Sequence, residues 1–171
     1  MRLIAERIKG FTNLQKGAKV LEIGAAQGLS IIAFEELGYE CSGIEPWEDA
    51  LEVSKQLAKN LNMKIDIRKG IAEKLPFADN SFDAVIADSV MEHVKDVECV
   101  MSEVFRVLKK GGAFYFSTAS AMCPKQGEIR FFPFFSWYPQ RLKVKIMNFA
   151  VKKKPSLVGY TEAPAINWFT P

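Results

Sequence analysis

Five short apolar segments, separated by loops and amphipathic stretches, constrain the fold of this chain more than any other feature. Runs such as KVLEIG and FDAVIADS are nearly continuous in apolar residues, which is typical of strands buried on both faces. Strands that alternate with helices specify a parallel sheet covered on both faces. The sequence therefore predicts an α/β protein with a doubly wound sheet. The five expected strands are 19–24, 40–45, 63–70, 82–89 and 113–118.

Caps and apolar faces mark the helices expected between these strands. The first helix covers 28–38 and ends at Gly38, because glycine readily ends a helix. The second opens at Pro46, a residue suited to a first helical turn. Its apolar face is predicted at Ala50, Val53, Leu57 and Leu61. The third begins after Asp96 as N-cap and is stopped by the glycine pair 111–112.

The alternation ends near Thr118, which predicts two parts. Residues 1–118 form the sheet domain, and residues 119–171 form an irregular or helical extension that caps a substrate or covers the sheet edge. The extension holds an aromatic stretch, RFFPFFSWYP, and a basic one, QRLKVKIMNFAVKKK.

The loop EIGAAQG follows the first strand, where a doubly wound sheet binds its ligand. Gly24 can make the tight turn, Ala26 leaves little bulk towards a ligand, and Gly28 permits close entry into the helix. The helix N-terminus then offers N–H groups to an anionic group. The alternative is that these small residues serve only the turn.

Glu45 ends the second strand, 21 residues after Gly24. At this distance a carboxylate can accept hydrogen bonds from both hydroxyls of an adenosine ribose. The alternative is a solvated carboxylate at a strand end. Leu29 stands where a dinucleotide-binding loop needs glycine, so the spacing favours adenosine without a pyrophosphate and disfavours an NAD-linked dehydrogenase.

Taken together, these motifs resemble the class I S-adenosylmethionine-dependent methyltransferases, in particular the type 11 group around the ubiquinone and menaquinone biosynthesis enzymes. The resemblance runs from VLEIGAAQG and GIEP through RKGIAEKLPFADNSFDAVIADSVMEHV to VFRVLKKGGAFYFST. Ala26 replaces the usual middle glycine of the first motif. The resemblance implies five parallel strands in the order 3-2-1-4-5 and S-adenosylmethionine as cofactor.

The resemblance also assigns residues to parts of that cofactor. Those near its methionine end would be Glu22, Gly24, Ala26 and Gly28. Glu45 would hold the ribose. Those flanking the adenine would be Ala72 and Glu73, although a solvated loop carboxylate is the alternative for Glu73. Those forming the floor beneath the sulfonium would be Asp88 and Ser89.

Methyl transfer from a sulfonium requires mainly alignment and the exclusion of water. A base assists where the nucleophile must lose a proton. His93 is the only histidine and therefore the candidate catalytic base. The alternative is that His93 bonds to the backbone and orders its loop. Glu92 is expected to order that loop rather than act as an acid.

The extension is expected to recognise a small-molecule or lipid-like acceptor through its aromatic and basic residues. Peripheral membrane contact through 129–154 is a further expectation, with coverage of the sheet edge as the alternative. A net charge of +3 gives no reason to expect nucleic acid.

The chain stops at Pro171, whereas the resembling families continue with a helix and two further strands. The sequence thus predicts that these last strands are missing and that strand five lies at a sheet edge, where it is covered or self-associates. Weak or absent turnover would follow. The alternative function is a truncated, non-catalytic cofactor-binding or scaffolding relative.

The three cysteines are far apart and form no CxxC pair, so we expect no disulfide framework and no metal site. No apolar run approaches the length of a membrane-spanning helix, and the N-terminus has no signal-peptide core. A soluble cytoplasmic protein is expected.

Overall fold

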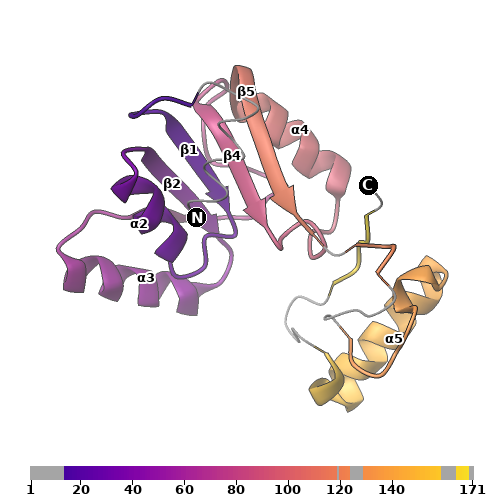
Figure 1. The fold of residues 1–171 in the computed structure, drawn as a ribbon. Helices are drawn as coiled ribbons and strands as arrows, with labels where there is room; N and C mark the ends of the chain where they lie inside the picture. Colours follow the sequence, from indigo (N-terminus) through magenta and orange to yellow (C-terminus); the bar gives the residue numbers. More distant parts are fainter. Residues whose placement is uncertain (1–13, 119, 124–128, 159–164, 170–171) are drawn as a thin grey trace. The chain divides into compact units, whose positions relative to one another are not determined.

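The computed structural model of the chain describes residues 14–118, 120–123, 129–158 and 165–169 (Figure 1). These residues divide into two compact units. The first lies within 1–88 and 96–116, and the second within 89–95 and 117–171. The functional division predicted near Thr118 stays a prediction.

The first unit is built on a five-stranded parallel sheet in the order β3-β2-β1-β4-β5. This confirms the predicted doubly wound order. β2 and β4 flank β1 in parallel register, and β3 continues the sheet beyond β2. The strands are β1 (Lys19–Ile23), β2 (Glu40–Glu45), β3 (Asp66–Lys69), β4 (Phe82–Asp88) and β5 (Leu108–Ser117).

Among the described residues, three helices cover this sheet: α2 (Leu29–Glu36), α3 (Glu48–Leu61) and α4 (Val97–Val107). In Figure 1, α2 and α3 lie on one side of the sheet and α4 on the other. Right-handed crossovers that leave the central strand in opposite directions produce this arrangement. Asp96 caps α4 as predicted, since its carboxylate accepts from the Cys99 N–H at 3.0 Å. Gly38, with φ of +90°, follows the end of α2 as predicted.

The predicted apolar face of α3 is wrong. Leu51 and Ser54 are its buried residues, whereas Val53 and Leu61 are exposed. The helix also begins at Glu48, after Pro46. Ser54 is buried because it packs beside Gly28, where a larger side chain on either residue would not fit.

The predicted boundary between α4 and the fifth strand is also wrong. The helix ends at Val107 and β5 begins directly at Leu108, so the glycine pair lies inside the strand. The N–H groups of Asn80 and Ser81 donate to the last two carbonyls of the helix, at 2.9 and 2.8 Å. These bonds satisfy the helix end before the glycines are reached. Gly111 remains necessary for the bend it makes, with φ of +81°.

One core cluster of the first unit lies between the sheet and α2. Apolar side chains from β1, β2, β4 and α2 fill it at close to complete burial. This packing fixes the strand ends from which the loops described below emerge. Its buried members are Leu14, Val20, Ala25, Ile31, Phe34, Tyr39, Cys41, Ala84 and Ile86.

The second unit is irregular and helical, as predicted. Its described segments contain two short 3₁₀ helices, η1 (Phe135–Trp137) and η2 (Pro155–Leu157), and the longer α5 (Gln140–Lys153). Trp168 packs against the Phe135 ring at 5.5 Å between centroids. The buried members of its core are Ile129, Phe135, Met147, Ala150 and Val158.

Within the described residues, β5 is an edge strand of the sheet, as predicted. Its coverage by residues 129–139, or self-association through it, stays a prediction. No helix among the residues that the structure describes is long and apolar enough to cross a membrane.

Candidate cofactor site

The sheet register brings three acidic positions to one edge of the first unit. Glu22 on β1 pairs with Gly43 on β2 and with Ile86 on β4. Two residues further along each strand come Gly24, Glu45 and Asp88. Because these strands are parallel, their carboxyl ends meet at the same edge. The predicted residues Glu22, Gly24, Glu45 and Asp88 are therefore neighbours.

Glu45 is buried at this edge, with only 4 % of its surface exposed. One carboxylate oxygen, Oε2, accepts from the Ala26 N–H at 2.8 Å, and Oε1 accepts from the Trp47 N–H at 3.1 Å. The alternative of a solvated carboxylate is therefore wrong. Each oxygen has two lone pairs, so the carboxylate can still accept from two hydroxyl groups.

The glycine loop is held by bonds to the neighbouring strand. The N–H groups of Gly24 and Ala25 both donate to the Ile44 carbonyl, at 3.0 and 2.9 Å. Gly24 and Ala26 have φ of +74° and +46°. This left-handed region costs an alanine roughly 1–2 kcal/mol, which explains why glycine would be favoured at residue 26.

Gly28 needs to be glycine for a reason that the sequence did not indicate. Its φ is +82°, and an added Cβ would lie 2.8 Å from Ile67 Cδ1 and 3.3 Å from Ser54 Oγ. A side chain would therefore collide with β3 and α3 inside the protein. The predicted close entry into the helix at Gly28 therefore depends on packing inside the protein. A role for Gly28 near the methionine end of a cofactor stays a prediction.

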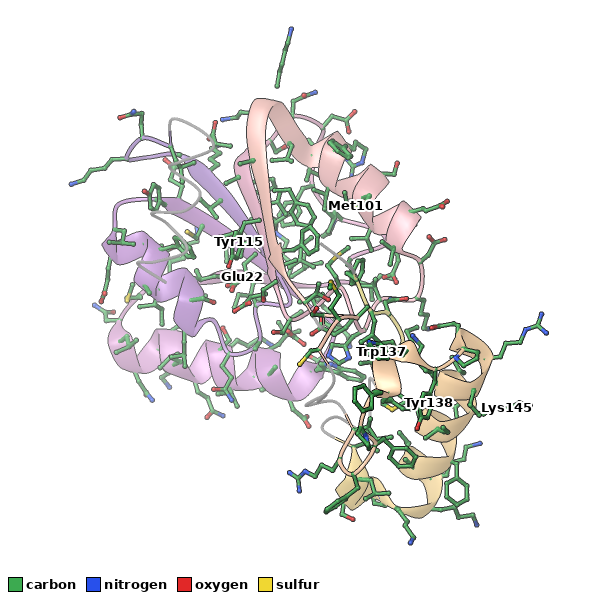
Figure 2. All side chains as sticks on the ribbon, turned by 45° about the vertical axis from the view of Figure 1, so that its right-hand side comes forward. Glu22, Met101, Tyr115, Trp137, Tyr138 and Lys145 are labelled. Carbon is green, nitrogen blue, oxygen red and sulfur yellow. The ribbon has the colours of Figure 1, made fainter. Side chains whose placement is uncertain are left out.

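Glu22 is a buried carboxyl group, 7 % exposed, that Figure 2 labels in the interior of the first unit. Burial raises the pKa of Glu22 to about 7, with smaller contributions from the nearby charges of Asp88 and Glu45. The Ser30 hydroxyl donates to this carboxyl group and partly opposes the rise in pKa. The sequence reading missed Ser30, although a serine in the first turn after the loop was a usable signal.

The predicted adenine side is a turn between β3 and β4. Ala72 is buried and Glu73 is half-buried, within a turn closed by pairing of Ile71 with Lys74. The Cys99 thiol donates to the Glu73 carbonyl at 3.2 Å. The turn is thus anchored to α4, and the solvated-carboxylate alternative for Glu73 stays open.

Arg106 on α4 fixes the segment after this turn, and the sequence reading missed it. Its guanidinium donates to the Leu75 carbonyl at 3.0 Å and to the Phe77 carbonyl at 2.8 Å. Glu103 accepts from the same guanidinium and from the Leu75 N–H at 2.7 Å. Arg106 beside it holds the pKa of Glu103 down at about 2. The spacing of Glu103 and Arg106 on one helix face was the available signal.

The remaining predicted residues follow β4. Asp88 is the last residue of β4 and is exposed. Ser89, with φ of +56°, and His93 belong to the second unit. The His93 N–H donates to the Val90 carbonyl at 2.8 Å, which places His93 in a tight turn. Its role as a base stays a prediction.

Glu92 orders this loop, as predicted. It is buried, and its carboxylate accepts from the Thr118 hydroxyl at 2.9 Å. Its carbonyl accepts from the N–H groups of Ile166 and Asn167, at 2.7 and 3.1 Å. Glu92 therefore connects three segments of the second unit.

Two surface concavities of the first unit lie elsewhere. One, of about 340 Å³, is bordered by residues 14–18 and 109–112 at the amino ends of the strands. The other, of about 280 Å³, lies between α3 and β3. The candidate site is therefore defined by its loop and carboxylates rather than by either concavity.

The donor set suits an organic cation that carries a diol. Glu45 and Asp88 make the site negative, and Glu22 adds negative charge as pH rises through its pKa of about 7. Glu45 can also accept from vicinal hydroxyls. Among the described residues, no three His, Cys, Asp or Glu side chains form a metal-binding group. Sheet, loop and buried carboxylate together are typical of an α/β domain that binds a nucleoside.

Comparison with known proteins identifies the family. Residues 21–116 match the family described as "Methyltransferase domain", and the chain belongs to this family. S-adenosylmethionine is accordingly its cofactor, and its sulfonium and ribose fit the negative, diol-accepting site.

Individual relatives agree with this assignment. An uncharacterized methyltransferase YcgJ of Bacillus subtilis is 36% identical over 97 residues, covering 56% of this chain and 38% of that protein. A ubiquinone biosynthesis O-methyltransferase of Rhizobium leguminosarum is 32% identical over 103 residues, covering 60% of this chain and 41% of its own length. The solved YcgJ structure superposes with a TM-score of 0.65 at 26% identity, covering 92% of this chain and 61% of that one. The chain spans about two fifths of the length of these curated relatives.

Proposed function

We propose that this chain binds S-adenosylmethionine in its first unit and directs methyl transfer to a small-molecule or lipid-like acceptor in the cytoplasm. The observation that carries the proposal is the buried Glu45 carboxylate, which accepts from the Ala26 N–H and keeps lone pairs for a ribose diol. Family membership favours this activity over a non-catalytic scaffolding role. The name of the Rhizobium relatives supports oxygen as the first acceptor atom to test.

When bound, the cofactor supplies a methyl group on its sulfonium, and this group passes directly to a nucleophile as the thioether leaves. The chain has to position and shield the reactants, because this leaving group is already activated. Glu45 orients the ribose and holds the glycine loop through Ala26. Glu22 and Asp88 contribute negative charge that favours a cation at the strand ends.

His93 is the residue proposed to take a proton from the acceptor. It is the only histidine of the chain, and imidazole is the type of side chain that most often acts as a general base near neutral pH. The turn made by its N–H bond to Val90 is compatible with this role.

Isothermal calorimetry with S-adenosylmethionine tests the proposal. The Glu45→Ala variant should bind about 1–3 kcal/mol more weakly, the scale of hydrogen bonds to a charged group. Glu40→Ala, which removes an exposed carboxylate from the same strand, is the matched control. Circular dichroism verifies that both variants are folded.

Binding of S-adenosylhomocysteine, which lacks the sulfonium charge, provides a second comparison. The wild type should bind the charged cofactor more tightly, and Glu22→Gln should reduce that difference. Unchanged affinity in a folded Glu45→Ala protein would remove Glu45 from the site and with it the observation that supports the proposal.

A further inference from the structure

The second unit concentrates positive charge in one stretch of the chain. Residues 129–158 contain seven of the 23 lysines and arginines and none of the 20 acidic residues. One of the seven, Lys143, is buried, with its ammonium group 4.3 Å from the centroid of the Trp168 ring. The other six are exposed to solvent. Most of this charge is therefore available to a partner.

The helix α5 carries two opposite faces. Its buried face, Lys143, Met147 and Ala150, packs into the core of the second unit. The exposed stripe, defined here as Leu142, Lys145, Phe149 and Lys152, follows the three-and-four-residue spacing of one helix side. Apolar and basic residues alternate along this stripe.

The two apolar residues of the stripe are solvent-exposed in this structure. Leu142 is 45 % exposed and Phe149 is 59 % exposed. Figure 2 labels Lys145, which lies between them in the stripe, on α5. Exposed apolar side chains flanked by lysines are typical of a helix that lies flat in the headgroup region of a membrane.

The segment before α5 exposes further aromatic rings. Phe131 is 87 % exposed, and Phe134 packs on Trp137 at 4.9 Å between ring centroids while both remain exposed. Phe131 and Phe134 have φ of +65° and +56°, a region that bulky residues rarely adopt. Strain of this kind is kept where surrounding structure or function requires it.

We infer that the second unit docks on an anionic lipid surface through the exposed stripe of α5 and the exposed aromatic rings of residues 131–137. The six exposed basic residues complement anionic headgroups. Leu142, Phe149 and the aromatic rings enter the interface, where apolar side chains gain free energy. Binding to a nucleic-acid backbone would use the same charges, but it would leave Leu142 and Phe149 in water. The exposed apolar residues Leu142 and Phe149 therefore favour a lipid surface over nucleic acid as the partner.

Co-sedimentation of the full chain with vesicles tests this inference. The chain should bind vesicles of phosphatidylcholine with about a third phosphatidylglycerol, and not vesicles of phosphatidylcholine alone. Lys145→Gln/Lys152→Gln should weaken binding about 30-fold. Phe149→Ser should weaken it about tenfold. High salt should reduce wild-type binding, since it screens the attraction to the headgroups.

Matched variants in the first unit serve as controls. Lys59→Gln/Lys64→Gln removes the same charge from exposed positions, and Phe105→Ser removes a phenylalanine that is 69 % exposed. Both should bind vesicles like the wild type. The inference is overturned if the wild type binds neither vesicle, binds both equally, or loses no affinity in the α5 variants. Binding to a duplex oligonucleotide but not to vesicles would overturn it in favour of nucleic acid. None of these results depends on methyl transfer.

Discussion

Replacing Glu22 by glutamine should change how the stability of the protein depends on pH. Glutamine has nearly the same size and can still accept the Ser30 hydroxyl bond, but it does not titrate. In the folded protein the pKa of Glu22 is raised from 4.5 to about 7 by burial and by the neighbouring carboxylates. The native state therefore holds a proton between these pH values that the unfolded chain has released.

The magnitude follows from that difference. A rise from 4.5 to about 7 corresponds to about 3 kcal/mol, at 1.36 kcal/mol for each unit. The stability from this proton is fully present below pH 4.5 and is lost as pH rises to about 7. Relative to Glu22→Gln, the free energy of unfolding of the wild type should fall by about 3 kcal/mol across this window.

Urea unfolding followed by circular dichroism, repeated between these pH limits, measures the difference. Glu40→Gln, which removes an exposed carboxyl group at the start of β2, is the control. A difference between wild type and Glu22→Gln that stays constant with pH would refute the reasoning. Calorimetry adds a second readout, because a cationic cofactor beside Glu22 should displace its proton near pH 6. Buffers of different ionisation enthalpy should reveal that proton for the wild type and not for Glu22→Gln.

Three further changes test other parts of the structure. Gly28→Val should lower stability by about 2–4 kcal/mol in urea unfolding, because of its φ of +82° and the contact with Ile67; a variant as stable as the wild type would contradict this packing. His93→Ala should cut turnover on the true acceptor about 100-fold or more while sparing cofactor affinity, and turnover within a few-fold of wild type would favour the loop-ordering role. Arg106→Met should lower the free energy of unfolding by about 2 kcal/mol, because it leaves the Leu75 and Phe77 carbonyls without their charged donor. Arg106→Lys should lower it less. Equal stability of the wild type and both variants in urea unfolding would contradict this role of Arg106.

The strands were predictable because buried parallel strands require continuous apolar runs, and their order followed from the resemblance to a known family. Glu45 was predictable for a related reason: its distance from Gly24 is set by one crossover of the fold. The buried face of α3 was not predictable. Ser54 reads as polar in any periodicity, and its burial depends on Gly28, which comes from another part of the chain.

The backbone contacts that hold the segment after the adenine-side turn could not be predicted from the sequence either. Arg106 reads as an ordinary helix-end cation, whereas its partners are backbone carbonyls of Leu75 and Phe77, 31 and 29 residues away. Every residue carries a backbone carbonyl, so the residue types do not indicate which carbonyls accept from Arg106. The end of α4 at Val107 was missed in the same way, because Asn80 and Ser81 satisfy it through their N–H groups.

The bonds that Arg106 and Glu103 make also determine how this part of the protein opens. They join the Leu75–Phe77 segment to α4, so neither can separate from the other without breaking several charge-assisted hydrogen bonds. The segment and the helix then form one cooperative opening unit in native-state hydrogen exchange. We therefore expect the Leu75 amide to exchange together with the amides of α4 rather than with those of exposed loops.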